Sequence, residues 1–222
     1  MALVEQVKTK ELFDCRVSYL TPLFEKHLYP WQMLPELKGY IRNLIAEGIE
    51  GFTEIAPEVL VGQNVKIAST ATIEGPAIIG SNTEIRPGAY IRGSVITGPD
   101  CVIGNSSELK NSVLLEHVQV PHYNYVGDSV LGNFAHMGAG AICSNLKSDG
   151  KNVVVRGEER HETGLRKLGG VIGDHGDVGC GCVLNPGTVI GQNTSVYPLT
   201  SLRGVYPANT IVKATKDIVE KK

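Results

Sequence analysis

The sequence predicts an all-β chain wound into a triangular β-solenoid, in which three hexapeptides make one coil. Two observations predict this fold class: an aliphatic residue recurs every six positions, and a mostly small residue stands four places after each one. A period of six fits neither an α-helix nor a coiled coil, whose repeats are about 3.6 and 3.5 residues. Gly-Asn and Gly-Asp steps between the aliphatic positions supply residues that tolerate turns.

The repeat occupies two tracts of the chain. Nine of the eleven positions taken at intervals of six from Val61 to Pro121 are Val, Ile or Leu, and the same interval runs from Ile172 to Leu202. These side chains are expected to fill the interior of the coil, with successive coils stacked at the ~4.8 Å spacing of neighbouring strands. The period slips at Pro121, directly before His122.

Segments without the period divide the chain further. Residues 1–50 are expected to form a small, mostly helical N-terminal cap that covers an end of the solenoid, with a helix that stops at Gly48. Residues 51–213 are expected to form the solenoid. The charged segment 147–169 lacks the period and is expected to leave the coil as a loop, which either lines a binding site or is a solvated excursion. Residues 214–222 are expected to be a tail of surface helix or disorder.

Composition argues against several classes of partner. The 222 residues contain 21 Lys and Arg against 23 Asp and Glu, so a net charge of −2 gives no electrostatic reason to expect nucleic acid or a membrane surface. No apolar run approaches the roughly 18 residues that span a bilayer, and the N-terminus lacks the apolar stretch of a signal peptide. Five cysteines without a secretion signal favour reduced thiols. These features predict a cytoplasmic protein.

The region 104–145 resembles a known family. The stretches GNSSELKNS, PHYNYVGDSVLG and MGAGAICSN, together with IRPGA at 85–89, are similar to the acetyltransferase part of the bacterial bifunctional N-acetylglucosamine-1-phosphate uridyltransferase. They are also similar to the C-terminal part of archaeal sugar-1-phosphate nucleotidylyltransferases. The resemblance covers roughly residues 60–213. It implies a left-handed parallel β-helix that assembles as a homotrimer with active sites between subunits, and we expect the nucleotidyltransferase domain of those relatives to be absent.

The resemblance also implies an activity, the acetyl-CoA-dependent N-acetylation of an amino sugar phosphate such as glucosamine 1-phosphate, in nucleotide sugar metabolism. Acetyl-CoA would be a co-substrate, and no metal is expected. The matching positions are His122 and Asn145 for catalysis, Arg86 or Arg92, Lys110 and Tyr125 for substrate binding, and Cys180 and Pro198 near acetyl-CoA. Leu146 stands where the family usually has a tyrosine, so the acceptor sugar and the acyl group stay open.

The chemistry of these residue types fits acetyl transfer. A neutral imidazole can accept the proton that an amine loses as it attacks a thioester, and such assistance is typically worth about 10²–10⁴ in rate. With Pro121 as an inward position, His122 is expected to point outward, as does Lys110 on another face. A shared site would then form between subunits. Lys110 lies one coil beyond Arg92, which suits a phosphate or CoA site, and Asp128 is expected to be a turn residue.

Two other functions are compatible with the sequence. A non-catalytic module could bind a sugar nucleotide or a partner chain and be related to UDP-N-acetylglucosamine pyrophosphorylases through the same resemblance. The γ-type carbonic anhydrases use this fold to hold zinc with three histidines. His117, His122 and His136 suggest such a site, but no histidine lies between His27 and His117, where a further ligand is needed.

Overall fold

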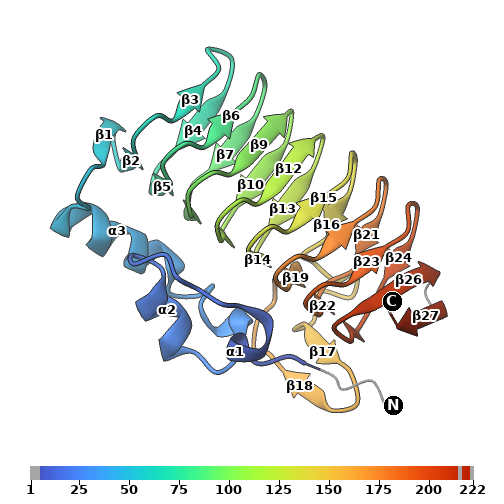
Figure 1. Cartoon of the computed structure of the whole chain (residues 1–222). Coiled ribbons are helices and arrows are strands. Elements are labelled where there is room, and N and C mark those ends of the chain that lie inside the picture. Colours follow the sequence, from blue (N-terminus) through green and yellow to red (C-terminus); the bar gives the residue numbers. More distant parts are fainter. Residues whose placement is uncertain (1–5, 215–216, 221–222) are drawn as a thin grey trace.

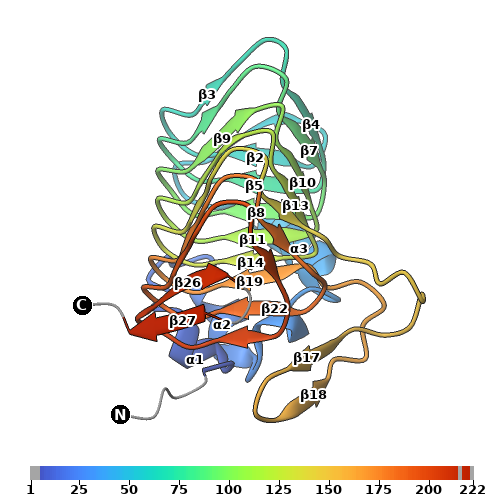
Figure 2. The same cartoon turned by 90° about the vertical axis from the view of Figure 1, so that its right-hand side faces the viewer.

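Three parallel sheets wound into one triangular coil form most of the molecule (Figure 1 and Figure 2). The structure is a computed structural model that describes residues 6–214 and 217–220. Each coil contributes one short strand to each sheet, and strands of successive coils pair in parallel. The predicted all-β, left-handed parallel β-helix is confirmed.

The strands belong to three sheets, named A, B and C here, and to one separate hairpin. Sheet A contains β1 (Thr53–Ala56), β2 (Val59–Val61), β5 (Ala77–Ile79), β8 (Val95–Thr97), β11 (Ser112–Leu114), β14 (Val130–Leu131), β19 (Gly170–Ile172), β22 (Thr188–Ile190) and β25 (Val205–Tyr206). Sheet B contains β3 (Lys66–Ile67), β6 (Glu84–Ile85), β9 (Val102–Asn105), β12 (Gln119–His122), β15 (His136–Met137), β20 (Asp177–Val178), β23 (Ser195–Val196), β26 (Thr210–Ala214) and β27 (Asp217–Glu220). Sheet C contains β4 (Thr72–Glu74), β7 (Tyr90–Arg92), β10 (Glu108–Lys110), β13 (Tyr125–Gly127), β16 (Ile142–Cys143), β21 (Val183–Leu184) and β24 (Ser201–Leu202). The hairpin consists of β17 (Val154–Arg156) and β18 (Arg160–Glu162).

The coils shorten by one residue partway along the solenoid. Ile91 lies beside Leu109, eighteen positions on, whereas Leu109 lies beside Val126, seventeen positions on. The residue is lost at the corner between sheets C and A, where Asn111 adopts the left-handed conformation with a φ of +47°. Residues from this corner up to Asp128 are therefore shifted by one relative to the six-residue count, and a second short corner at Asp128 shifts the residues that follow, such as Leu131, by one more.

The shorter coil changes which residues face the interior. After Leu109 the next interior residue is Leu114, and the interior residue of β12 is Val120 rather than Pro121. Leu115, which the period placed inside, packs instead in an apolar cluster outside the coil. The expectation that the repeat slips at Pro121 is therefore wrong, because the slip has already occurred at the preceding corner.

A second apolar core covers the outer face of sheet A. The N-terminal segment contains α1 (Thr9–Leu12), α2 (Thr21–Lys26), the 3₁₀ helix η1 (Pro30–Gln32) and α3 (Leu37–Glu47). Its apolar side chains pack against outward-facing residues of sheet A such as Ile78 and Ile96, both fully buried. Gly48 ends α3 with a φ of +78°, as expected. Among the residues described, no helix combines the length and hydropathy that a bilayer crossing requires.

The helical segment lies along a side of the solenoid and not across its end, which differs from the expected cap (Figure 1). The Asp174 carboxylate ties it to the coil by accepting hydrogen bonds from the backbone N–H groups of Asp14 and Asn133, at 2.8 and 2.7 Å. The outer face of sheet A is apolar and needs this cover. The first and last strands of the stack are instead paired by antiparallel strands, β1 on β2 and β27 on β26.

Two other segments also differ from expectation. The charged insert at 147–169 carries the β17–β18 hairpin, and its Val153 and Val155 are fully buried in the second core, so it is not a solvated excursion. The ring of His161 in β18 lies 5.1 Å from that of Tyr29. In the tail, residues 217–220 form a strand rather than the expected helix or disorder, and its remaining residues beyond Ala214 lie outside the described part of the chain.

Replacing Gly104 with Ala is expected to destabilise the solenoid just beneath His122. A Cβ atom at Gly104 would lie 1.6 Å from the carbonyl oxygen of Pro121 in the next coil, so the two coils would have to separate. Overpacking typically costs about 1–3 kcal/mol, and a backbone neighbour relaxes less readily than a side chain, so we expect the free energy of unfolding to fall by at least about 2 kcal/mol. Urea denaturation followed by circular dichroism measures the change.

Gly39→Ala provides the matched control for this substitution. A Cβ atom at Gly39 in α3 meets no atom within 4 Å, and alanine favours a helix over glycine by up to about 1 kcal/mol. The free energy of unfolding is therefore expected to rise in this variant. Equal effects of the two substitutions would contradict the close stacking of Gly104 under Pro121.

Candidate functional site

His122 lies at the corner between sheets B and C, at the end of β12. Tyr123 turns the chain there with a φ of +52°. The buried amide of Asn124 holds the corner, since its Nδ2 donates to the carbonyls of Gly138 and Ala141 at 2.8 and 3.2 Å and its Oδ1 accepts from the backbone N–H of His122 at 3.0 Å. His122 is exposed, and no hydrogen bond or ion pair to its ring occurs among the described residues.

Three other exposed residues occupy the same corner position in later coils. The register of the parallel strands places Ala139, Cys180 and Pro198 successively beyond His122. Backbone hydrogen bonds follow the same column, for example from the N–H of Gly140 to the carbonyl of His122 at 3.0 Å. These four residues, His122, Ala139, Cys180 and Pro198, are called the corner column below. The structure thus brings the predicted base into line with both residues predicted to lie near acetyl-CoA.

Glycines flank the corner column at Ala139 and Cys180, whereas Pro121 and the exposed Tyr123 flank His122 itself. Gly138 and Gly179 lie on one side of the column, and a Cβ atom at Gly140 on the other side would meet nothing within 4 Å. In the last of these coils, Tyr197 and Leu199 are 49% and 83% exposed. The surface that leads from His122 toward the C-terminal coils therefore has little side-chain cover at Ala139, whereas beside Cys180 the Leu199 side chain lies over Gly181, where a Cβ atom would be 2.8 Å from Leu199 Cδ2.

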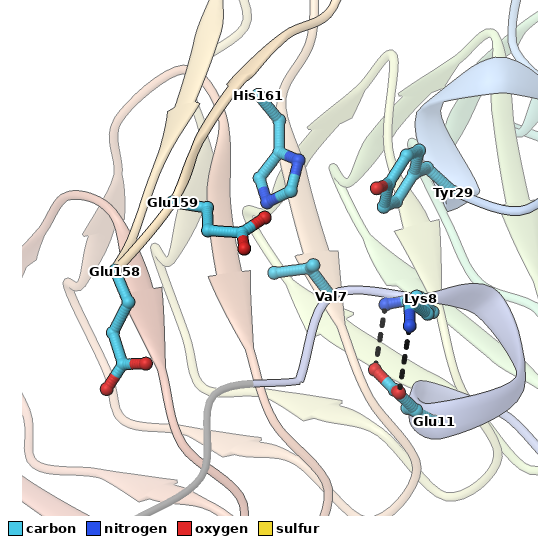
Figure 3. A pocket seen from close by; sticks show the side chains of 7 residues that line it. All are labelled: Val7, Lys8, Glu11, Tyr29, Glu158, Glu159 and His161. Atoms are coloured by element: carbon cyan, nitrogen blue, oxygen red, sulfur yellow. Dashed lines mark hydrogen bonds and ion pairs between the residues drawn. The ribbon is translucent and has the colours of Figure 1, made fainter.

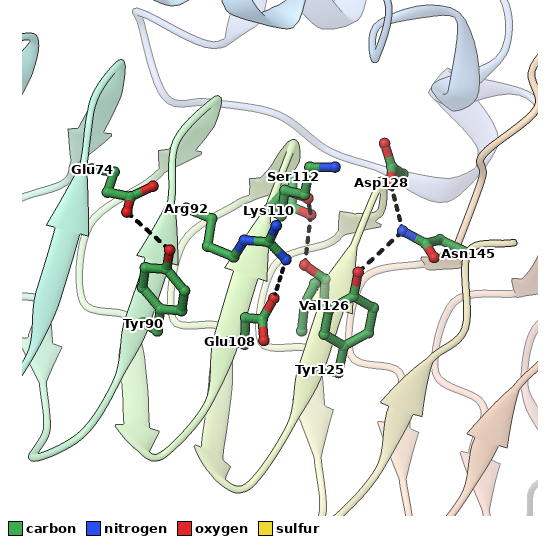
Figure 4. Close-up of polar contacts among 10 residues, drawn as sticks. All are labelled: Glu74, Tyr90, Arg92, Glu108, Lys110, Ser112, Tyr125, Val126, Asp128 and Asn145. Carbon is green, nitrogen blue, oxygen red and sulfur yellow. Dashed lines mark hydrogen bonds and ion pairs between the residues drawn. The ribbon is translucent and has the colours of Figure 1, made fainter.

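A second group of predicted residues lies on the outer face of sheet C (Figure 4). Arg92 and Lys110 occupy the same outward position in successive coils, because Ile91 pairs with Leu109. The guanidinium of Arg92 lies 2.6 Å from the Glu108 carboxylate. Lys110 on sheet C and His122 at the end of β12 therefore stand on different faces of one chain, as the sequence predicted. The interior residue of β12 is Val120, and not Pro121 as the six-residue count implied.

The structure separates the two arginines that the sequence left as alternatives. Arg92 lies with Lys110 on sheet C, whereas Arg86 follows β6 on sheet B. The Arg86 guanidinium is 3.2 Å from the Glu84 carboxylate. Arg86 lies two coils below Pro121, on the side of the solenoid that carries His122.

Tyr125 and Asn145 meet at the edge of sheet C that lies away from His122 (Figure 4). The Nδ2 atom of Asn145 donates to the Tyr125 hydroxyl at 3.1 Å and to Asp128 Oδ2 at 2.6 Å. Asp128 has a φ of +50°, as a turn residue can, but its carboxylate is also buried and hydrogen bonded. Within one chain Asn145 therefore contacts Tyr125 and Asp128 rather than the imidazole of His122.

The histidines considered for zinc do not converge within one chain. The His117 ring stacks on Phe134 at 4.5 Å, at the corner between sheets A and B, so His117 and His122 stand at opposite ends of β12. The Nδ1 atom of His136 lies 2.8 Å from an Asp177 carboxylate oxygen. No group of three or more potential metal ligands occurs in the described ranges.

Two of the pockets on the described part of the chain border the inserted hairpin. One separates the N-terminal segment from the hairpin and is lined by Val7, Lys8, Glu11, Tyr29, Glu158, Glu159 and His161 (Figure 3). The other lies where the hairpin meets the last coils and is lined by Lys147, Val154, Arg156, Pro186, Arg203 and Gly204, so three basic side chains border it. Neither contains a residue of the corner column, which lies on the open surface of a single chain.

Comparison with known proteins identifies a matching family model and bifunctional relatives. The family model described as the GMPPB C-terminal domain matches residues 73–161. The bifunctional sugar-1-phosphate nucleotidylyltransferase/acetyltransferase of Sulfurisphaera tokodaii is 36% identical over 174 residues, which are 76% of this chain and 43% of that protein. The chain thus spans less than half the length of the bifunctional relatives that it matches.

Two further matches cover a larger share of the matched protein's own length. The solved structure of a mutant of AntD, an N-acyltransferase from Bacillus cereus, covers 82% of this chain and 89% of its own at 19% identity, with a TM-score of 0.43. YaiX of Escherichia coli K12, named as an uncharacterized acetyltransferase, is 34% identical over 212 residues, 90% of this chain and 92% of YaiX. Because this identity runs through nearly the whole of both sequences and the fold is a hexapeptide β-helix, the chain belongs to the family of hexapeptide-repeat acetyltransferases that includes YaiX.

Proposed function

We propose that this chain is an acetyl-CoA-dependent N-acetyltransferase whose acceptor is an amino sugar phosphate of the glucosamine 1-phosphate kind. The observation that carries the proposal is the corner column, in which the exposed imidazole of His122 lies in register with Ala139, Cys180 and Pro198. Membership of the acetyltransferase family supports the reaction type. Acetyl-CoA serves as co-substrate, and the transfer uses no metal.

The reaction needs a base at the point where the amine meets the thioester. The amine nitrogen attacks the acetyl carbonyl carbon, the carbon–sulfur bond breaks, and CoA leaves. The neutral imidazole of His122 accepts the amine proton and returns it to the departing sulfur. Because its ring has no partner among the described residues, it is available for this exchange.

The proposed acyl carrier lies along the corner column, with its pantetheine arm beside Cys180 and Pro198. Small residues there let a narrow chain approach the backbone closely. Arg156 and Arg203, at the rim of the small pocket next to the hairpin, offer cations to phosphate groups of a carrier, whereas Lys147 there is paired with Asp149 at 3.1 Å. This gives the inserted hairpin a role, since it supplies Arg156.

A homotrimer would complete this site. Within one chain the corner column and Lys110 lie on different faces, and cyclic symmetry can bring the corner of one copy against sheet C of the next. Tyr123 and Leu199, 66% and 83% exposed at this corner, provide apolar surface suited to a subunit contact. A cytoplasmic location, as predicted from the sequence, is part of this proposal.

Removing the imidazole is expected to slow the reaction. His122→Ala should lower kcat for acetylation of glucosamine 1-phosphate by about 10²–10⁴-fold, because proton transfer then depends on water. Chromatographic measurement of the N-acetylated product avoids interference from protein thiols. His117→Ala is the matched control, since its ring stacks on Phe134 at another corner, and its rate should be unchanged. An unchanged rate in His122→Ala would rule out the assigned base. Absence of product with every amino sugar phosphate tested would favour the non-catalytic binding module.

Lys110→Met is expected to weaken binding of the acceptor through its phosphate. Loss of a hydrogen bond to a charged group should raise KM for glucosamine 1-phosphate about tenfold or more, with little change in kcat. Glucosamine itself should be affected much less, because it lacks the phosphate. Lys66→Met, on an exposed strand end of the first coil, is the control and should leave both KM values unchanged. Equal effects of Lys110→Met on both acceptors would contradict the phosphate contact.

A further inference from the structure

Asp128 is the buried centre of the polar contacts at one edge of sheet C (Figure 4). Asp128 is only 6% exposed. One carboxylate oxygen accepts from Asn111 Nδ2 at 2.8 Å, and the other accepts from Asn145 Nδ2 at 2.6 Å. Its backbone is fixed as well, because its N–H donates to the carbonyl of Lys110 and its carbonyl accepts from the N–H of Gly169. The carboxylate is therefore held in one place between two amides.

The carboxylate decides how the neighbouring amide is turned. An ionised carboxylate only accepts hydrogen bonds, so the amide atom of Asn145 that faces Asp128 must be nitrogen. The same nitrogen lies 3.1 Å from the hydroxyl oxygen of Tyr125. Because an amide nitrogen only donates, Tyr125 is the acceptor in this contact. The phenolic proton of Tyr125 must then point to a different partner.

Charges of both signs surround Tyr125, because the carboxylates of Glu108, which is paired with Arg92, and of Asp128 lie near it as well as Lys110. Gly127 makes room for the ring, since a Cβ atom there would lie 2.5 Å from the Tyr125 hydroxyl and 2.8 Å from Asn145 Nδ2. Burial raises the pKa of the Tyr125 phenol, so it keeps its proton at neutral pH. Lys110 occupies the position next to Gly127 in the adjacent coil and brings a positive charge to the same face.

We propose that Asp128 is a positioning residue that, through Asn145, makes Tyr125 a hydrogen-bond donor to an anionic oxygen of the acceptor, namely the phosphate held at Lys110. This inference rests on the proposed function for the identity of the acceptor, and it adds the direction of the contact and the residue that sets it. A ligand that presents an N–H group to the Tyr125 hydroxyl is disfavoured, because two hydrogen-bond donors would then face each other.

Asp128→Asn tests the inference without changing the size of the side chain. The new amide can donate, so Asn145 can turn its oxygen toward position 128 and toward Tyr125, and there accept the phenolic proton. The affinity for glucosamine 1-phosphate, and for inorganic phosphate, is expected to fall about tenfold, as it should in Tyr125→Phe. In the Tyr125→Phe background, Asp128→Asn is expected to cause no further loss, because the proton that it redirects is already missing. Isothermal titration calorimetry with both probes measures these affinities.

Asp100→Asn is the matched control, because Asp100 has a φ of +60° at a different corner and lies away from sheet C. It should bind both probes normally, and thermal unfolding of each variant reports whether the fold is intact. Independent, additive losses in the double variant would overturn the proposal. So would unchanged affinity in Asp128→Asn, or no binding of either probe to the unaltered chain. If the unaltered chain binds phosphate with the expected coupling but transfers no acetyl group, the proposed function fails and the positioning role stands.

Discussion

The parallel pairing of successive coils is the constraint on which the rest of this structure depends. Individual strands have only two to five residues, so their stability comes from stacking and from interior rows such as Ile85, Ile103 and Val120. Because the sheets are in register, one residue in each coil shares a column with its counterparts above and below. A shift by a single position would remove His122 from the line of Ala139 and Cys180 and would leave no candidate site at that corner.

The one-residue shortening of the coils and the polar cluster on sheet C arise at the same corner. Asn111 and Asp128 are the left-handed residues of two successive short corners, with φ values of +47° and +50°. Stacking in register places their side chains 2.8 Å apart, and Asn145 in the following coil adds the second amide. The two short corners that interrupt the six-residue period therefore also bring together the polar side chains that contact Tyr125. The regular scaffold positions His122, and its irregular corner positions the groups proposed to bind the acceptor.

The six-residue period predicted the fold because only a coil with three short sides keeps that interval over many repeats. It could not locate the shortened corner, since Leu114 and Leu115 are both leucine and either can follow Leu109 in the interior. The sequence does indicate that the outer face of sheet A is covered. Ile78 and Ile79 are an adjacent aliphatic pair, and such a pair indicates a strand that is buried on both faces. The role of Asp128 was beyond prediction, because its partners lie seventeen positions away on either side and become neighbours only through the coil register.

A thiol in the corner column allows the proposed path of the acyl carrier to be measured directly. Cys180 is the exposed thiol, whereas burial raises the pKa of Cys101 to about 12 and the pKa values of Cys15 and Cys143 to about 11. Alkylation by iodoacetamide, followed by peptide mass spectrometry, should therefore modify Cys180 first. Saturating acetyl-CoA is expected to slow this alkylation strongly and specifically. An unchanged rate at Cys180 under concentrations of acetyl-CoA that support turnover would show that the carrier binds elsewhere.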